Sequence, residues 1–106
     1  MTTLSEQEFR VRADEAIEGA REALLPLADE HEFVVELQNG VLQVIFEEPR
    51  EAKFVISPNA PVRQIWVSAM SRSFKASWDA DRTLFALSGE ALPDLLTRLA
   101  REFLAA

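Results

Sequence analysis

The sequence predicts an α+β fold, a two-layer sandwich in which two helices pack on one face of a five- to six-stranded antiparallel sheet. Three observations predict it: an amphipathic helical pattern at each end of the chain, short β-rich segments between them, and tight-turn residues that join these segments. Strands joined by tight turns must run antiparallel, because a parallel pair needs a long crossover. The apolar helix faces then cover one face of the sheet and leave the other for solvent or a partner.

The first helix is predicted to begin after Ser5, its N-cap. Glu8 completes a capping box with Ser5, and Leu4 can pack on Phe9 as a hydrophobic staple. Pro26 is predicted to end this helix or to bend its last turn. The apolar residues recur at the three- and four-residue spacing of one buried helical face: Phe9, Ala13, Ala16, Ile17, Ala20, Leu24 and Leu27.

The middle of the chain changes to short β-rich segments. The first two are separated by Asn39-Gly40, a strong tight-turn dipeptide. After the third segment, the two prolines of 57–61 are predicted to break the strand pattern. The predicted strands are 33–37, 41–46, 53–56, 64–69, 74–78 and 83–87.

The closing helix is predicted to begin at 88–90, Ser-Gly-Glu. Pro93 then lies in its first turn, where the missing N–H does no harm. Its apolar residues share one face: Leu92, Leu95, Leu96, Leu99 and Phe103. The chain holds no internal repeat, low-complexity segment or linker, so residues 1–106 are predicted to form a single domain.

The net charge of −7 lies entirely in the first third of the chain. Residues 1–36 hold ten acids and three bases, whereas residues 37–106 hold eight of each. An acidic chain without a basic cluster is not expected to bind nucleic acid or an anionic membrane, since both need Lys and Arg. The absence of cysteine and the single histidine, His31, exclude thiolate sites and histidine clusters for metals.

Other classes are also excluded by what the sequence lacks. No apolar run approaches the roughly 20 residues that span a bilayer, and the first residues carry no signal-peptide pattern. A cytoplasmic protein is therefore expected. The chain has no P-loop, nucleophile-elbow or dinucleotide-binding motif, and each of its three glycines stands at a turn or a helix end. The protein is therefore not expected to be an enzyme.

Several segments resemble the frataxin family and its bacterial members, the CyaY-type iron donor proteins. Segment 36–42 (Glu-Leu-Gln-Asn-Gly-Val-Leu) is similar to the first hairpin of that family. Segment 61–68 (Pro-Val-Arg-Gln-Ile-Trp-Val-Ser), which follows Phe54-Val55-Ile56, resembles its central signature. The resemblance implies a frataxin-like fold and an iron-binding adaptor of iron–sulfur cluster assembly that docks on a cysteine desulfurase and a scaffold protein. It implies a monomer, with iron-dependent oligomerisation left open.

An acidic ridge is the first candidate site. Carboxylates without histidine or cysteine favour hard cations such as Fe3+, Mn2+, Ca2+ or Mg2+. The resemblance implies iron (Fe2+ or Fe3+), held weakly at the surface. A run of glutamates on a helix is also what a solvated face looks like, so both interpretations stay open, while His31 is expected to be a bystander. The candidate ligands are Asp14, Glu15, Glu18 and Glu22 on the helix, and Asp29, Glu30, Glu32 and Glu36 on the following loop and first strand.

A tryptophan-bearing sheet face is the second candidate site. Strand alternation puts Trp66 on the outer face with its polar neighbours, and Ile65 and Val67 against the helices. An exposed tryptophan among polar residues is a common interface anchor, although Trp66 could instead lie flat on the sheet and pack on neighbours such as Trp78. The resemblance implies that Trp66 contacts the assembly scaffold. The candidate partner-binding residues are Trp66, Gln64, Arg63 and Asn59.

These two sites leave two functions open. In the first, the ridge presents iron while the sheet face touches the assembly complex. In the second, the chain is an interaction module whose acidic face binds a basic partner with no role for a metal.

Overall fold

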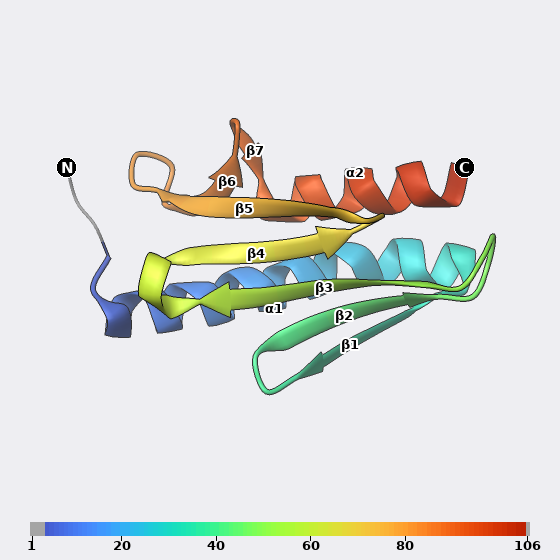
Figure 1. The fold of residues 1–106 in the computed structure, drawn as a ribbon, viewed down its shortest axis with the longest axis horizontal. Coiled ribbons are helices and arrows are strands. Elements are labelled where there is room, and N and C mark those ends of the chain that lie inside the picture. The colour runs from blue at the N-terminus through green and yellow to red at the C-terminus, as the bar shows by residue number, and fades with distance from the viewer. Residues whose placement is uncertain (1–3, 106) are drawn as a thin grey trace.

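The computed structural model describes residues 4–105. One sheet of seven antiparallel strands runs in sequential order from β1 to β7, and α1 and α2 lie together on one of its faces (Figure 1). The predicted two-layer α+β sandwich is therefore confirmed, with one strand more than expected. The elements are α1 (Glu6–His31), β1 (Val34–Gln38), β2 (Val41–Phe46), β3 (Ala52–Asn59), the 3-10 turn η1 (Ala60–Val62), β4 (Gln64–Ala69), β5 (Arg72–Asp79), β6 (Leu84–Leu87), β7 (Glu90–Ala91) and α2 (Leu92–Ala105).

Helix α1 starts as predicted and ends later. The Glu8 amide donates to Ser5 Oγ and the Ser5 amide donates to Glu8 Oε1, each at 3.1 Å, so the capping box is formed. Pro26 does not end the helix, which continues for five residues to His31. The reason is packing, since Leu27 and Ala28 beyond the proline are buried in the core. Their burial offsets the backbone hydrogen bond that Pro26 cannot donate.

The predicted break of the third strand at residues 57–61 is wrong in its position. Strand β3 does not break at residue 57 but continues to Asn59, with Pro58 opposite Ile65 of β4. Pairing of β3 with β2 ends at Ile56. Beyond Ile56, β3 pairs with β4 only, and its other edge has no partner strand. The N–H that proline lacks is therefore not needed on that edge.

The seventh strand follows a turn at residues 88–89, where the sequence predicts the start of the closing helix. Ser88 and Gly89 have φ values of 51° and 84°, which reverse the chain so that Glu90 pairs with Leu87. The closing helix therefore begins at Leu92 and not at 88–90, with Pro93 in its first turn. No helix within residues 4–105 is both long and apolar enough to cross a membrane.

The core lies between the sheet and the two helices. Phe46, the last residue of β2, lies in the middle of a cluster of four rings, with ring centroids 4.7 Å from Phe33, 5.0 Å from Phe54 and 4.4 Å from Phe103. The cluster joins the α1–β1 connection, β2, β3 and α2. All the buried residues among 4–105 are apolar, so the polar side chains lie on the surface or at its margin.

Replacing glycine by alanine is expected to change the free energy of unfolding in opposite directions at two positions. Gly19 lies in the middle of α1, where an added Cβ would meet no atom of the described neighbouring elements within 4 Å. Gly19→Ala is expected to raise the free energy of unfolding by about 0.5–1 kcal/mol, because alanine loses less backbone entropy in a helix. Gly40 follows Asn39 in the β1–β2 turn at φ +78°. Gly40→Ala is expected to lower the free energy of unfolding by about 1 kcal/mol. Urea denaturation measures both, and equal signs would contradict the prediction.

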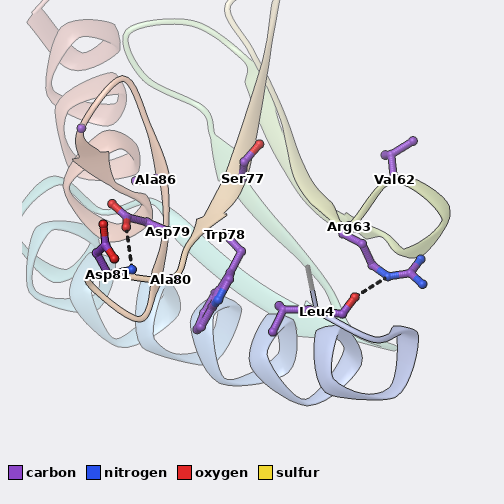
Figure 2. Close-up of a pocket in the computed structure, with 10 residues that line it drawn as sticks. Leu4, Val62, Arg63, Ser77, Trp78, Asp79, Ala80, Asp81 and Ala86 are labelled. Carbon is purple, nitrogen blue, oxygen red and sulfur yellow. Dashed lines mark hydrogen bonds between the residues drawn. The ribbon is translucent and has the colours of Figure 1, made fainter. Parts of the chain in front are cut away.

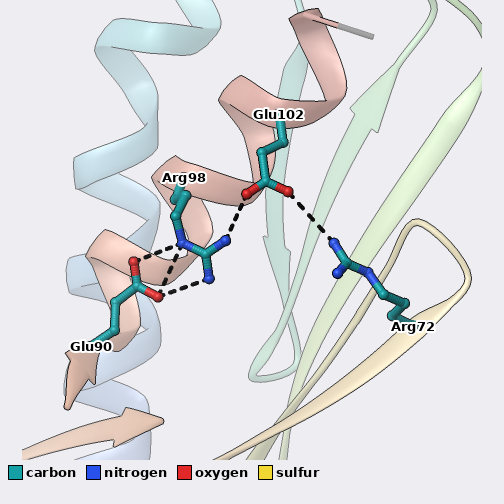
Figure 3. Close-up of polar contacts among 4 residues, drawn as sticks. All are labelled: Arg72, Glu90, Arg98 and Glu102. Carbon is teal, nitrogen blue, oxygen red and sulfur yellow. Dashed lines mark hydrogen bonds and ion pairs between the residues drawn. The ribbon is translucent and has the colours of Figure 1, made fainter. Parts of the chain in front are cut away.

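An ion-pair network fastens α2 to two strands (Figure 3). Arg98 donates through Nη2 to Glu90 Oε1 at 2.9 Å and through Nη1 to Glu102 Oε2 at 2.7 Å. Arg72 Nη2 of β5 lies 3.6 Å from the other oxygen of Glu102. The network thus links β7, α2 and β5 across the surface.

The network predicts a pH dependence. Hydrogen bonds from Arg98 hold the pKa of the Glu90 carboxyl below its ordinary value. A carboxyl with a lowered folded-state pKa contributes stability above its unfolded pKa of about 4.3, and that contribution is lost as the pH falls through the folded-state pKa. Glu90→Gln is therefore expected to be less stable than the wild type at pH 7, with the difference shrinking below about pH 4. Urea denaturation across this range measures it. Glu51→Gln, in an exposed connection, is the control, and a difference that grows on acidification would contradict the prediction.

Candidate functional site

The helical part of the acidic ridge is exposed but partly neutralised. Asp14, Glu15, Glu18 and Glu22 all lie on the surface of α1. Glu15 accepts from Arg12 at 3.4 Å, and Glu18 accepts from Arg21 at 3.0 Å. Two of the four predicted ligands are therefore already paired with a cation of the same helix.

The other four predicted ligands are not gathered beside them. Asp29 and Glu30 lie in the last turn of α1 and not in a loop, because the helix runs past Pro26. Glu32 forms the left-handed C-cap at φ 58°. Glu36 belongs to the exposed set of β1 opposite Gln43, on the sheet face that points away from the helices. His31 Nε2 lies 3.6 Å from Glu30 at the exposed end of the helix.

The donor chemistry suits a hard cation, but the geometry does not form a chelating site. Within residues 4–105, no three Asp, Glu or His side chains converge where they could hold one metal ion. Separate, exposed carboxylates keep their own hydration, so each would contact a cation singly and weakly. The ridge therefore does not fit a resident iron centre.

The outer sheet face presents Trp66 as the alternation predicts. The Trp66 side chain is 40% exposed, whereas Ile65, Val67 and Ala69 are buried against the helices. Trp66 Nε1 donates to Gln64 Oε1 at 3.1 Å. The Lys75 ammonium lies 5.2 Å from the centroid of the indole. The indole is thus held in place at the surface by two neighbouring side chains.

Trp78 is on the opposite side of the sheet. It is half-buried, with its ring 5.1 Å from that of Phe85 and the Arg12 guanidinium 5.7 Å from its own centroid. Trp78 is therefore not a neighbour on which Trp66 can pack, and the indole contacts Gln64 and Lys75 instead. The two tryptophans occupy different environments, which makes them a matched pair for mutation.

Arg63 and Asn59 both make contacts within the protein itself. Arg63 has φ 54°, donates through Nε to the carbonyl of Leu4 at 3.1 Å and through Nη1 to the carbonyl of Ala60. It thereby ties the start of α1 to η1 (Figure 2). Asn59 is half-buried and pairs with Gln64 in the ladder between β3 and β4. Both residues shape the end of the sheet that carries Gln64.

A wide hollow of about 680 Å³ opens between η1 and the β5–β6 connection (Figure 2). Trp78 and Leu4 supply apolar surface, and Asp79 and Asp81 lie at one end. The Asp79 carboxylate accepts from the amides of Asp81 at 3.1 Å and Arg82 at 3.2 Å. The Asp79 carboxylate is therefore already used within its own turn.

Lys75 is the residue of this face that sequence reasoning missed. It stands directly opposite Trp66 in the ladder between β4 and β5. Strand alternation within 74–78 places it on the outer face, but its pairing with Trp66 depends on the register. A short hairpin joining Ala69 to Arg72 sets that register.

Fold and surfaces together define an α+β sandwich domain with an acidic helix and an aromatic patch on its uncovered sheet face. A family model described as the frataxin-like domain matches residues 2–106. The chain therefore belongs to the frataxin-like family, and the resemblance seen in its sequence is confirmed.

Curated relatives agree with this assignment. The iron–sulfur cluster assembly protein CyaY of Stutzerimonas stutzeri strain A1501 is 32% identical over 95 residues, covering 86% of this chain and 84% of that protein. The protein of the same name from Pseudomonas fluorescens strain Pf0-1 is 30% identical over 104 residues, covering 94% and 89%. The solved frataxin of Psychromonas ingrahamii superposes with a TM-score of 0.63 over 96% of this chain and 90% of its own. At 15% identity, that structure supports the fold alone.

Proposed function

We propose that this chain is a non-catalytic adaptor of iron–sulfur cluster assembly that docks on a cysteine desulfurase and its scaffold protein. Its relatives at 30–32% identity carry the name of such an assembly protein. The observation that carries the docking role is Trp66, which is 40% exposed and held by Gln64 and Lys75 on an uncovered sheet face. A preordered aromatic side chain loses little entropy when a partner covers it.

The acidic helix supports a second docking contact of opposite character. Ten acids and three bases within residues 1–36 give this part of the chain a strongly negative field. Such a field steers association with a basic partner surface. Salt screens the field, so this association weakens at high ionic strength. Docking through α1 is therefore proposed to be sensitive to ionic strength.

Iron enters this proposal as a weakly held cargo. Exposed carboxylates that do not converge favour hydrated, exchangeable cations over a bound centre. The competing function is an interaction module that uses the same acidic face for a basic protein and has no role for a metal. The carboxylates of the ridge form no chelating group among residues 4–105, so iron would be held there only loosely. The two functions therefore differ in whether iron collects at the ridge.

An anaerobic Fe2+ titration followed by amide NMR separates the two functions. We expect line broadening confined to residues 15–36, reversible on dilution and reproduced by Mn2+, which is also paramagnetic and also prefers carboxylate ligands. The combined variant Glu15→Gln, Glu18→Gln and Glu22→Gln is expected to lose most of the response on α1. A wild-type protein that shows no site-specific response would leave the interaction module alone.

Docking itself is tested by capture. The wild-type chain, immobilised on a resin, is incubated with a lysate of its native host. It is expected to retain the desulfurase and the scaffold and to release them as the salt concentration is raised. Failure to recover either protein at low salt would contradict the adaptor role.

A further inference from the structure

Beside Trp66 the outer sheet face is hollowed by about 400 Å³. Two ladder rows cross this hollow. In one row Ser57 of β3 pairs with Trp66, which pairs with Lys75; in the other Val55 pairs with Ser68, which pairs with Ser73. The hollow thus combines apolar surface from the indole and Val55, hydroxyl groups from three serines, and one ammonium group.

The charge of this hollow is uncompensated. The Lys75 ammonium lies over the indole of Trp66, and no carboxylate within residues 4–105 forms an ion pair with it. The next outer-face pair along β4 and β5, Gln64 and Ser77, is uncharged. Glu36 lies on the same face but on β1, three strands from β4, which is about 14 Å at the spacing of neighbouring strands.

We infer that this hollow receives a carboxylate side chain, Asp or Glu, from an apolar stretch of the docked protein. The apolar neighbours of that carboxylate cover the indole and Val55, while the carboxylate meets the Lys75 ammonium and accepts from the serine hydroxyls. This inference rests on the proposed docking through Trp66 and adds the chemistry of the partner. Lys75 is the residue that determines specificity, because serine hydroxyls alone serve a neutral amide equally well.

The two faces of the molecule then select partners of opposite charge. α1 attracts a basic surface, whereas the hollow beside Trp66 prefers an acid within an apolar stretch. A partner suited to one face is repelled or unpaired at the other. The charges of the two faces thereby determine which partner lies on which side of this chain.

The preference of the hollow for a carboxylate is tested by NMR. Two probe peptides, N-acetyl-Val-Glu-Val-amide and its glutamine counterpart, are titrated at millimolar concentration into the 15N-labelled chain. We expect the glutamate peptide to shift the Trp66 indole N–H and the amides of Ser68, Ser73 and Lys75, and to bind about five- to tenfold more tightly than the glutamine peptide. Lys75→Gln is expected to remove that preference. Lys53→Gln, a lysine on the same face opposite Ile45, is the matched control and is expected to keep it.

The outcomes separate this inference from the adaptor role. Equal binding of the two peptides, absence of any shift in the hollow, or an unchanged preference in Lys75→Gln would overturn the inference. Capture of the assembly proteins would still stand in each of those cases. Conversely, a clear glutamate preference in a chain that captures neither protein would keep the inference and reject the proposed partners.

Discussion

Phe46→Ala is expected to lower the free energy of unfolding by about 3–5 kcal/mol. Phe46 is 1% exposed and touches rings from the α1–β1 connection, from β3 and from α2. Removing its ring leaves a cavity where both helices meet the sheet, and the Arg50 guanidinium that lies 4.6 Å from the Phe103 ring cannot fill it without being desolvated. Since domains of this size are stable by about 5–15 kcal/mol, the variant is expected to lose between about a fifth and all of its stability.

Urea denaturation followed by circular dichroism measures this loss. Val34→Ala is the control, because Val34 lies on the edge strand β1 and is 51% exposed. Its effect is expected to stay below about 1 kcal/mol. A loss of less than about 1 kcal/mol for Phe46→Ala would show that the rings around it do not form the centre of the core.

Trp66→Arg is expected to weaken docking on the assembly proteins by about thirtyfold or more, the range of a hot-spot anchor. It removes the exposed indole and places a guanidinium beside Lys75, so the hollow loses its apolar wall. The fold is expected to be unaffected, within about 1 kcal/mol of unfolding free energy, because the side chain lies on the outer face of the sheet.

The second tryptophan supplies the matched control. Trp78 is half-buried on the helix side against Phe85, so Trp78→Ala is expected to destabilise the protein by about 2–4 kcal/mol. Molecules of Trp78→Ala that remain folded are expected to dock with unchanged affinity in a calorimetric titration. If Trp66→Arg unfolds and Trp78→Ala does not, the roles assigned to the two faces are reversed.

Features set by neighbouring residues were predictable from the sequence. The Ser5–Glu8 capping box depends on two side chains three residues apart, and the turn at Asn39-Gly40 depends on two residues that tolerate positive φ. The side of the sheet on which Trp66 stands follows from the alternation of a single strand. In each case the physical cause acts within a few residues, so no knowledge of distant contacts was needed.

Features set by distant contacts were not predictable in the same way. Pro26 stays inside α1 because Leu27 and Ala28 pack into the core, and Pro58 stays inside β3 because β2 pairs no further than Ile56. The contact of Arg63 is of the same kind, since its guanidinium donates to the carbonyl of Leu4, 59 residues away in the chain. Each of these outcomes depends on a neighbour that only folding brings close.

The acidic excess shows the same division. Its sign, its size and its concentration in residues 1–36 follow from the sequence alone, and they determine that this end of the molecule attracts cations and basic surfaces. The pairs of Glu15 and Glu18 with arginines three residues away are local contacts within α1. Whether the carboxylates meet was decided by the tertiary structure, which places Glu36 on the sheet face that points away from the helices. The reason is that charge adds along the chain regardless of conformation, whereas a ligand set requires side chains to converge in space.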